Sequence, residues 1–276
     1  MRPVPGLNLH TLTSSVTRVA ADAGRLLEGY FNRLDDVEIR TKTSAADMVS
    51  EADTRAEDLI RERLAALLPE AGFIGEESYD PQAPRQELNW VVDPLDGTSN
   101  FLSGLQIWAV SIALTDEHLQ PLIGVVHSPE LRNTWSAARG MGTTCNGVGV
   151  TVRDHPPGGN LVNAMLATGF PYDIKGPDGQ KNIHNFVRMQ TNFHKIRRLG
   201  SAAVDLALVA DGTFDGMWEL KLRSWDSAAG ILLVTEAGGI CEQISGEAYT
   251  PGDDDLLVAS RRDLLELMRS ILRPTE

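Results

Sequence analysis

The segment from Trp90 to Thr98, WVVDPLDGT, constrains the fold more than any other part of the chain. It places two carboxylates at the end of an apolar run that is typical of a buried strand. Pro94 lacks a backbone N–H and has a fixed φ, so a regular central strand should end at Asp93. Gly97 tolerates backbone angles that other residues avoid, so the chain can turn sharply after Asp96. We therefore expect both carboxylates to project from one strand end into one small volume.

The close approach of Asp93 and Asp96 indicates a divalent metal site. Two like charges in a small volume are costly unless cations neutralise them. Ligands that are all oxygen favour Mg²⁺, with Mn²⁺ as a related hard ion. The alternative is an ordinary surface hairpin, since Asp-Gly is a common turn dipeptide.

The composition limits the ligands that the protein can attract. Its 276 residues carry a formal net charge of -13, with 42% hydrophobic and 23% charged residues. Nucleic acids need a cationic footprint, so this charge argues against general nucleic-acid binding. A bound divalent cation would reverse the charge locally, so an anionic substrate remains compatible with an acidic chain.

The cysteines and the apolar stretches indicate a cytoplasmic protein. Cys145 and Cys241 lie far apart and match no zinc pattern. They leave a disulfide open, although a reducing cytoplasm is the simpler expectation. Residues 1–6 have no apolar run of the signal-peptide type, and no stretch is long enough to cross a bilayer. The histidines are scattered, without the short spacing that is typical of metal ligands.

Hydrophobic periodicity predicts an α+β first half. Apolar residues recur at helical spacing over residues 12–30, and a small polar loop is expected at 41–47. A second helix should begin near Asp53 and Thr54, where Thr54 and Glu57 have the spacing of a capping box. Short strands separated by polar turns then predict an antiparallel meander, at residues 73–74, 90–92, 108–114, 122–126 and 134–138.

Strands and helices alternate in the second half, which predicts an α/β arrangement. We expect strands at residues 161–167, 214–220 and 256–259, and helices at 181–195, 201–210, 227–237 and 262–272. The last helix should be capped by Ser260 and Asp263. The prolines and glycines within residues 153–160 predict a boundary between an N-terminal domain, 1–152, and a smaller C-terminal domain, 153–276.

Further acidic residues have structural as well as functional explanations. Glu76 and Glu77 follow an expected short strand, but they also suit a solvated surface. Asp226 and Asp53 both stand where a carboxylate can cap a helix N-terminus. The small residues after Asp226 would let its helix approach another element closely, as a shared metal site requires.

Three separated motifs, taken in chain order, resemble the inositol monophosphatase family of Mg²⁺-dependent, Li⁺-sensitive sugar phosphatases. They are GEES at residues 75–78, WVVDPLDGTSNF at 90–101 and WDSAAGILLVTEAGG at 225–239. Residues 47–53 look like the acidic segment that precedes them in the family. The resemblance covers nearly the whole chain. It implies a layered αβαβα sugar-phosphatase fold, with a mixed N-terminal sheet and a smaller C-terminal α/β part.

The resemblance implies a site for two to three Mg²⁺ ions, with Mn²⁺ as a substitute. Glu76, Asp93 and the Leu95 carbonyl would hold the first ion, and Asp93 would bridge to the second. Asp96 and Asp226 would complete the second site, so its ligands would come from both halves of the chain. Glu76 would also contribute, through water, to a weaker third site.

Catalytic and substrate-binding roles follow from the same resemblance. Thr98 and Asp53 would orient the attacking water and help to deprotonate it. The backbone N–H groups of Gly97 and Thr98 would receive phosphate oxygens. Contacts to the substrate would come from Asp96, Gly97, Thr98, Gly200, Ser201, Ala202 and Glu219.

The activity implied is Mg²⁺-dependent hydrolysis of inositol monophosphate, or of a similar polyol phosphate, by direct in-line attack of water. Relatives hydrolyse fructose 1,6-bisphosphate, histidinol phosphate or adenosine 3′,5′-bisphosphate, and the shared motifs do not separate these substrates. Some bacterial relatives are also protein partners in ribosomal RNA transcription, so a binding protein is the alternative of another class. The resemblance further implies a homodimer and inhibition by lithium.

Overall fold

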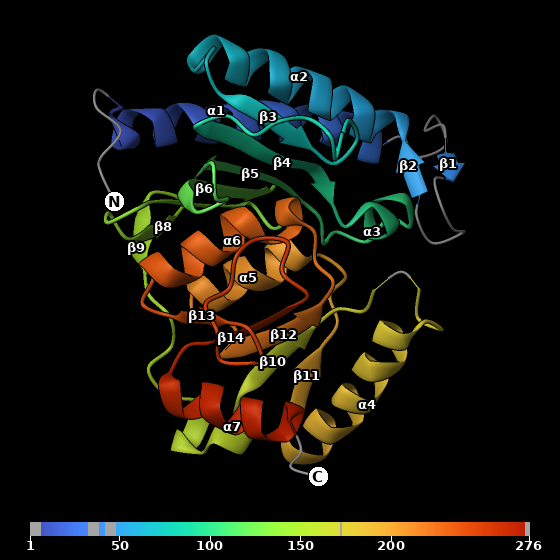
Figure 1. Cartoon of the computed structure of the whole chain (residues 1–276), viewed down its shortest axis with the longest axis vertical. Helices are drawn as coiled ribbons and strands as arrows, with labels where there is room; N and C mark the ends of the chain where they lie inside the picture. Colours follow the sequence, from blue (N-terminus) through green and yellow to red (C-terminus); the bar gives the residue numbers. More distant parts are fainter. Residues whose placement is uncertain (1–6, 33–38, 42–47, 172, 274–276) are drawn as a thin grey trace.

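The computed structural model describes residues 7–32, 39–41, 48–171 and 173–273. Helices and sheets alternate in layers, which follow one another from top to bottom in Figure 1. This arrangement confirms the layered αβαβα fold that the sequence predicts. Most of the loop expected at residues 41–47 lies outside the described residues.

The first layer consists of α1 (Leu9–Phe31) and α2 (Glu51–Leu67). Both helices present one apolar face to the sheet below, because their buried residues recur at intervals of about three and four. In α1, the buried residues at this spacing include Leu12, Val16, Val19, Ala23 and Leu27. A short antiparallel pair, β1 (Ile39–Thr41) and β2 (Met48–Ser50), precedes α2.

The second layer is a seven-stranded sheet in the order β3-β4-β5-β6-β7-β8-β9. Its strands are β3 (Gly72–Gly75), β4 (Leu88–Asp96), β5 (Ala109–Asp116), β6 (Pro121–Ser128), β7 (Asn133–Ala138), β8 (Thr143–Cys145) and β9 (Val148–Val150). From β4 onward each strand pairs antiparallel with the next, so the predicted meander is confirmed. The first strand, β3, pairs parallel to β4.

The fourth layer is a five-stranded mixed sheet in the order β11-β10-β12-β14-β13. Its strands are β10 (Met165–Thr168), β11 (Lys195–Arg197), β12 (Gly216–Leu220), β13 (Ile240–Glu242) and β14 (Asp255–Ala259). Strand β10 runs parallel to β11 and β12, and the remaining pairs are antiparallel. Two short 3₁₀ turns, η2 (Pro157–Gly159) and η3 (Leu161–Asn163), come before this sheet.

Helices α5 (Ala202–Ala210) and α6 (Ser224–Glu236) form the middle layer, between the two sheets (Figure 1). Both are apolar on nearly every side, because each is covered from above and below. Two glycines permit the close packing. A Cβ at Gly124 of β6 would lie 2.6 Å from the Ala229 carbonyl oxygen, and one at Gly230 would lie 2.5 Å from the Leu206 Cβ.

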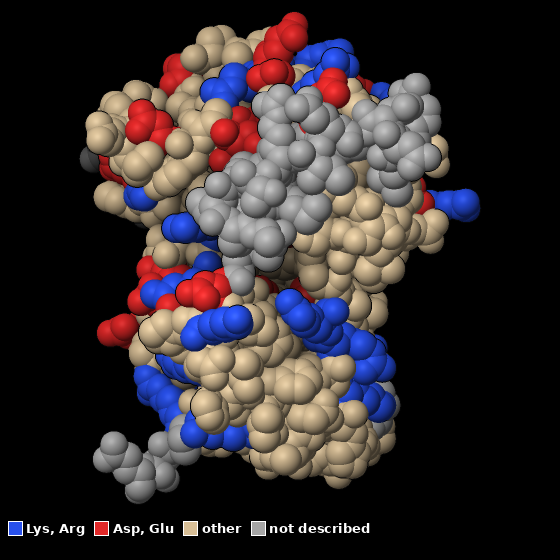
Figure 2. Space-filling view, turned by 90° about the vertical axis from the view of Figure 1, so that its right-hand side faces the viewer, with Lys and Arg blue, Asp and Glu red and all other residues tan. Residues whose placement is uncertain are grey.

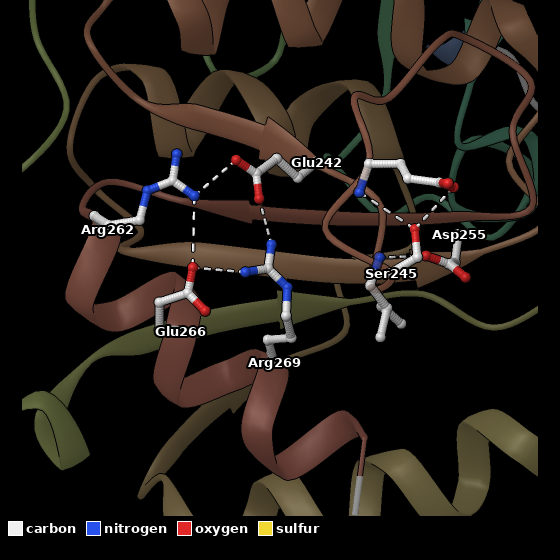
Figure 3. A network of polar contacts seen from close by, with 8 residues as sticks. Glu242, Ser245, Asp255, Arg262, Glu266 and Arg269 are labelled. Atoms are coloured by element: carbon white, nitrogen blue, oxygen red, sulfur yellow. Dashed lines mark hydrogen bonds and ion pairs between the residues drawn. The ribbon is translucent and has the colours of Figure 1, made fainter.

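Helices α4 (Pro177–Asn192) and α7 (Arg262–Leu272) cover the outer face of the second sheet. Figure 3 shows the ion pairs that tie α7 to β13. Glu242 of β13 pairs with Arg262 at 2.7 Å and also with Arg269, and Arg269 pairs with Glu266 at 2.6 Å. Arg269 is only 13% exposed, so this network is better shielded from solvent than an ordinary surface pair.

The strands of the two sheets come from opposite sides of the segment 151–164. Helix α6 nevertheless packs against strands of the first sheet as well as against α5. The division into domains 1–152 and 153–276 stays a prediction. In the described part of the chain, no helix has the length and apolar character needed to span a membrane.

Two expectations for the first half are wrong. Helix α2 begins at Glu51, so Thr54 lies inside the helix and does not form a capping box with Glu57. Strand β4 also does not end at Asp93 but continues to Asp96, with a shift of register against β5. Pro94 removes only one N–H, and pairing resumes at Asp96 because a bulge absorbs the interruption.

Several boundaries in the second half also differ from the prediction. Residues 161–163 form the turn η3, and α4 begins at Pro177, a residue that suits the first turn of a helix. Helix α6 begins at Ser224, three residues before the expected start. The N-cap position of α7 is Arg261, without a side-chain capping bond, and the Ser260 hydroxyl is buried without a hydrogen-bond partner among the residues described, so the expected cap by Ser260 is not formed.

Candidate active site

The end of β4 brings Asp93 and Asp96 to one edge of the first sheet. Asp93 pairs with Ser111 of β5 and Asp96 pairs with Ala109, so β4 contains one more residue than β5 between these two pairs. The Asp93 Oδ1 atom accepts a hydrogen bond from the Leu95 N–H at 2.9 Å, which stabilises the bulge. The surface-hairpin alternative is thereby excluded, since Asp93 is only 2% exposed.

Asp93 lies among other carboxylates from distant parts of the chain. Burial raises the pKa of Asp93 well above its usual range, and neighbouring negative charges raise it further. These charges belong, in decreasing order of effect, to Glu76, Asp96, Asp226 and Asp53. The structure therefore brings together the acidic residues that the sequence singled out.

Parallel pairing with β4 places Glu76 beside this cluster. Gly75, the last residue of β3, faces Val92, and the Glu76 N–H donates to the Val92 carbonyl at 3.1 Å. Glu76 thus emerges from β3 at the edge where Asp93 emerges from β4. Its side chain is half-buried, which contradicts the alternative of a fully solvated surface residue.

Gly97 and Thr98 form the turn from β4 into the short helix α3 (Thr98–Leu102). Gly97 has φ of 95°, a conformation that favours glycine, and a Cβ there would lie 2.9 Å from the Ile107 carbonyl oxygen. The Thr98 hydroxyl lies 3.0 Å from the Leu95 carbonyl oxygen and 3.3 Å from the Asp53 Oδ2 atom. Asp53, which is 1% exposed, therefore faces the β4 turn from α2.

Asp96 joins the two halves of the chain. Its Oδ2 atom accepts hydrogen bonds from the Ser201 hydroxyl at 2.5 Å and from the Ala203 N–H at 2.7 Å. Burial raises the pKa of Asp96 to about 6, although these bonds oppose the shift. Gly200 precedes this contact with φ of 83°. The turn at residues 200–202 therefore lies against the end of β4.

Asp226 enters the cluster from the first turn of α6. Its Oδ2 atom accepts the Arg223 N–H at 2.7 Å, so the capping interpretation is correct. Burial, followed by the charges of Glu76 and Asp96, raises the pKa of Asp226 well above its usual range. Capping and membership of the acidic cluster are therefore compatible for this residue.

Glu219 lies on β12, close enough to Asp96 for the two carboxylates to interact electrostatically. It is 9% exposed, and burial together with the charge of Asp96 raises its pKa to about 8, while Arg198 opposes the shift. A Cβ at Gly169 would lie 1.8 Å from a Glu219 carboxylate oxygen, so only glycine leaves room for this side chain. The Gly169 carbonyl is held in turn by the Asn182 side chain of α4, at 2.6 Å.

Asp205 is a member of this region that the sequence interpretation missed. It lies on α5, is 1% exposed, and its Oδ1 atom is buried without a hydrogen-bond partner. Burial, and then the charges of Glu219 and Asp96, raise its pKa well above the usual range. Its signal in the sequence is a lone charge within the otherwise apolar helix AAVDLALVA.

The donor set fits a hard divalent cation. Carboxylate oxygens from Glu76, Asp93, Asp96 and Asp226 share one region and repel one another, and a cation would relieve this repulsion. Across the residues that the structure describes, no group of three such side chains is already arranged around a common point. The Oδ2 atoms of Asp96 and Asp226 accept hydrogen bonds from hydroxyl and N–H donors, so the Oδ1 atom of each carboxylate is the one that these bonds leave for a cation.

Figure 2 shows the side of the molecule that is on the right in Figure 1. The outline narrows to a waist between the upper and lower halves, and acidic side chains are visible there. Lys and Arg side chains gather on the lower half just below the waist. The chain is thus acidic overall but carries a group of Lys and Arg side chains on this face of its lower half.

Comparison with known proteins defines the class as phosphoric monoester hydrolases. The chain belongs to the inositol monophosphatase family, whose model matches residues 8–275. It is 37% identical over 263 residues to an inositol-1-monophosphatase of Mesorhizobium japonicum, covering 95% of this chain and 97% of that protein. It is 38% identical over 241 residues to the Nus factor SuhB of Escherichia coli K12, covering 86% and 87%.

A solved structure supports the same placement. The extragenic suppressor protein suhB from Bartonella henselae superposes with a TM-score of 0.88 at 32% sequence identity. The match covers 96% of this chain and all of that one. Both the sequence and the fold therefore place the chain in this family.

Proposed function

We propose that the protein hydrolyses small phosphomonoesters, with inositol monophosphate or a similar polyol phosphate as its substrate. The observation that carries this proposal is the convergence of Asp53, Glu76, Asp96 and Asp226 on Asp93. A cluster of this kind is costly without cations and useful with them, because bound cations attract the phosphate dianion.

Metal binding is assigned to Glu76, Asp93, the Leu95 carbonyl, Asp96 and Asp226, which would hold two to three Mg²⁺ ions or Mn²⁺ in their place. Bound metal lowers the pKa of water, offsets the charge on phosphoryl oxygens and stabilises the leaving alkoxide. Because Asp226 belongs to α6 and the others to the first sheet and its loops, the site would close only when both parts of the fold are in place.

The remaining residues would position water and substrate. Asp53 would accept a proton from the attacking water, while the Thr98 hydroxyl would hold that water in line with the phosphorus. The N–H groups of Gly97 and Thr98 would bind phosphate oxygens. Asp96, Glu219 and the turn at 200–202 would receive substrate hydroxyls. Phosphoryl transfer needs mainly positioning and charge stabilisation, so no covalent nucleophile is required.

Phosphate release across a panel of substrates tests the proposal. The panel is inositol 1-phosphate, fructose 1,6-bisphosphate, histidinol phosphate and adenosine 3′,5′-bisphosphate, each with Mg²⁺ and with a chelator. We expect turnover of inositol 1-phosphate that disappears with the chelator. A strong preference for a bisphosphate would replace the substrate assignment, and release unaffected by the chelator would overturn the metal assignment.

A role as a partner in transcription is the second candidate, and the similarity to the Nus factor SuhB favours it. Capture from cell extract with Asp93→Asn protein would separate the two. Specific recovery of transcription machinery, together with no phosphatase activity in the wild type, would favour the partner role. A homodimer, inhibition by Li⁺ and a cytoplasmic location remain predictions, and light scattering and lithium titration would test the first two.

A further inference from the structure

The side chain of Glu57 connects helix α2 to the loop that carries Glu76. The Glu57 side chain is only 3% exposed, and its Oε2 atom accepts the Glu77 N–H at 2.9 Å. The preceding residue, Glu76, donates its own N–H to the Val92 carbonyl at 3.1 Å. The backbone at Glu76 is therefore held on one side by β4 and on the other by α2.

Arg61 keeps the Glu57 carboxylate in place. One guanidinium nitrogen lies 3.0 Å from the Glu57 Oε1 atom, and the same nitrogen contacts the Ser78 hydroxyl. The guanidinium also lies over the Phe73 ring, 4.0 Å from its centroid. A buried carboxylate is costly unless it is paired and hydrogen-bonded, and both oxygens of Glu57 meet this requirement.

Gly75 leaves the room that this contact needs. A Cβ at that position would lie 2.3 Å from the Glu57 Oε2 atom and 2.6 Å from the Phe73 ring. The close approach of α2 to the end of β3 thus explains why glycine stands directly before Glu76. It also shows that the Glu57 side chain fills the space beneath the loop.

The spacing along α2 connects this contact to Asp53. Asp53, Glu57 and Arg61 follow one another at intervals of four residues, so they lie on one face of the helix. Asp53 faces the Thr98 hydroxyl. Glu57 accepts the Glu77 N–H, and Arg61 contacts Ser78. One rigid helix therefore spans the distance between the β4 turn and the Glu76 loop.

We propose that Glu57 is a positioning residue that fixes Glu76 relative to Asp53, with Arg61 holding its carboxylate. The proposal rests on the function proposed above for Glu76 and Asp53. Its consequence is that losing the Glu57 contact lets the Glu76 loop move and weakens metal binding, although every proposed ligand is still present. Neighbours that orient a metal ligand in this way typically contribute about 10–100-fold in affinity.

Titration with Mn²⁺ measures the metal affinity without relying on turnover. Electron paramagnetic resonance detects the free ion at each step of the titration. We expect Glu57→Ala to weaken the tightest Mn²⁺ site by about 10-fold or more. Glu57→Gln keeps an acceptor for the Glu77 N–H and should retain most of the affinity. Glu57→Asp keeps the charge but is one methylene shorter, so it should resemble Glu57→Ala. Glu62→Ala, an exposed position on the same helix, is the control.

Steady-state kinetics supply a second readout. In Glu57→Ala, raising the Mg²⁺ concentration should recover much of kcat, while KM for inositol 1-phosphate at saturating Mg²⁺ should stay near the wild-type value. A general loss of packing would instead lower the melting temperature of every Glu57 variant without separating Gln from Asp. If Glu57→Ala fails to fold, the difference in Mn²⁺ affinity between Glu57→Gln and Glu57→Asp tests the positioning role.

Two failures are distinguishable. If the wild type binds Mn²⁺ and cleaves substrate, but folded Glu57 variants bind Mn²⁺ with wild-type affinity, the positioning role is wrong and the proposed function stands. If the wild type itself binds no Mn²⁺, the proposed function is overturned and the positioning role with it.

Discussion

Asp93 is the residue on which the charges of the site converge, so its chemistry depends on whether a cation is present. Its neighbours favour the protonated carboxyl when no cation is bound, and a divalent ion would favour the ionised form instead. A single substitution in this cluster should therefore change the stability of the protein in opposite directions with and without metal. That reversal separates metal ligands from ordinary buried acids.

Asp93→Asn should abolish turnover while leaving the protein folded. The amide oxygen can still accept the Leu95 N–H, so the bulge of β4 should survive. Asparagine is neutral without taking up a proton, so the melting temperature in chelator should equal or exceed that of the wild type. Mg²⁺ should then raise the melting temperature of the wild type but not of the variant. Equal stabilisation of both proteins by Mg²⁺ would contradict the bridging role.

Asp53→Asn should separate proton transfer from metal binding. We expect kcat to fall by about 100-fold or more, the usual contribution of a general base, while Mn²⁺ affinity changes little. The amide can still accept the Thr98 hydroxyl, so the local geometry should hold. Phosphate-release assays at saturating metal give the measurement. Turnover of the Asp53→Asn variant at the wild-type rate would remove this role from Asp53.

At the scale of elements, the packing of α1 on β6 depends on one glycine. A Cβ at Gly24 would lie 2.6 Å from the His127 ring and 2.9 Å from the Pro129 side chain. A Cβ at Gly29, on the same helix, would meet nothing within 4 Å. The two positions therefore form a matched pair for measuring helix-to-sheet contact.

Gly24→Ala should destabilise the protein by about 1–3 kcal/mol, because the added methyl overpacks the contact with β6. Gly29→Ala should stabilise it by about 0.5–1 kcal/mol, because alanine is the better helix former in open space. Urea unfolding of both variants gives the comparison. Equal effects at the two positions would show that the close approach of α1 to β6 contributes nothing.

The same interface has a pH dependence. Burial, with the nearby charge of Arg25, lowers the pKa of His127 to about 4, and its Nδ1 atom lies 2.8 Å from the Thr134 hydroxyl. In the unfolded chain the pKa of histidine is about 6.5, so the unfolded state binds more protons between these values. The contribution of His127 to stability is complete above about pH 6.5 and is lost as the pH falls toward 4.

Unfolding free energies measured from pH 7 to pH 4 test this dependence. The wild type should lose up to about 3 kcal/mol more than His127→Asn, which cannot gain the proton. Carboxylates elsewhere titrate in both proteins, so only the difference between the two curves reports on His127. Parallel curves would show that the imidazole is not held neutral in the folded state.

The type of an element was predictable where a local residue pattern determines it. The boundaries of an element were not predictable where a contact with a distant part of the chain determines them. The apolar spacing of α1 and the meander of β4 to β7 follow from local sequence. Glu57 looked like a capping partner of Thr54, but it bonds a backbone N–H twenty positions away. Asp205 carried no local signal beyond its charge, because its neighbours Glu219 and Asp96 come from other elements.

At the scale of the whole molecule, the layered fold separates the acidic residues in sequence and brings them together in space. Helix α6 lies between the sheets and carries Asp226 to the end of β4, where Asp93 and Asp96 emerge. The resemblance of the three motifs to the family implied this meeting. The orientation of the side chains was not predictable, since it depends on donors such as Ser201 and Arg223.

The central claim is that carboxylates from both halves of the chain bind hard cations together. Crystals soaked in Mn²⁺ and measured at the manganese absorption edge test it most directly. We predict anomalous peaks within bonding distance of the Asp93 carboxylate, with one of them also bonded to Asp226. Ordered carboxylates without any anomalous peak beside them would contradict the account.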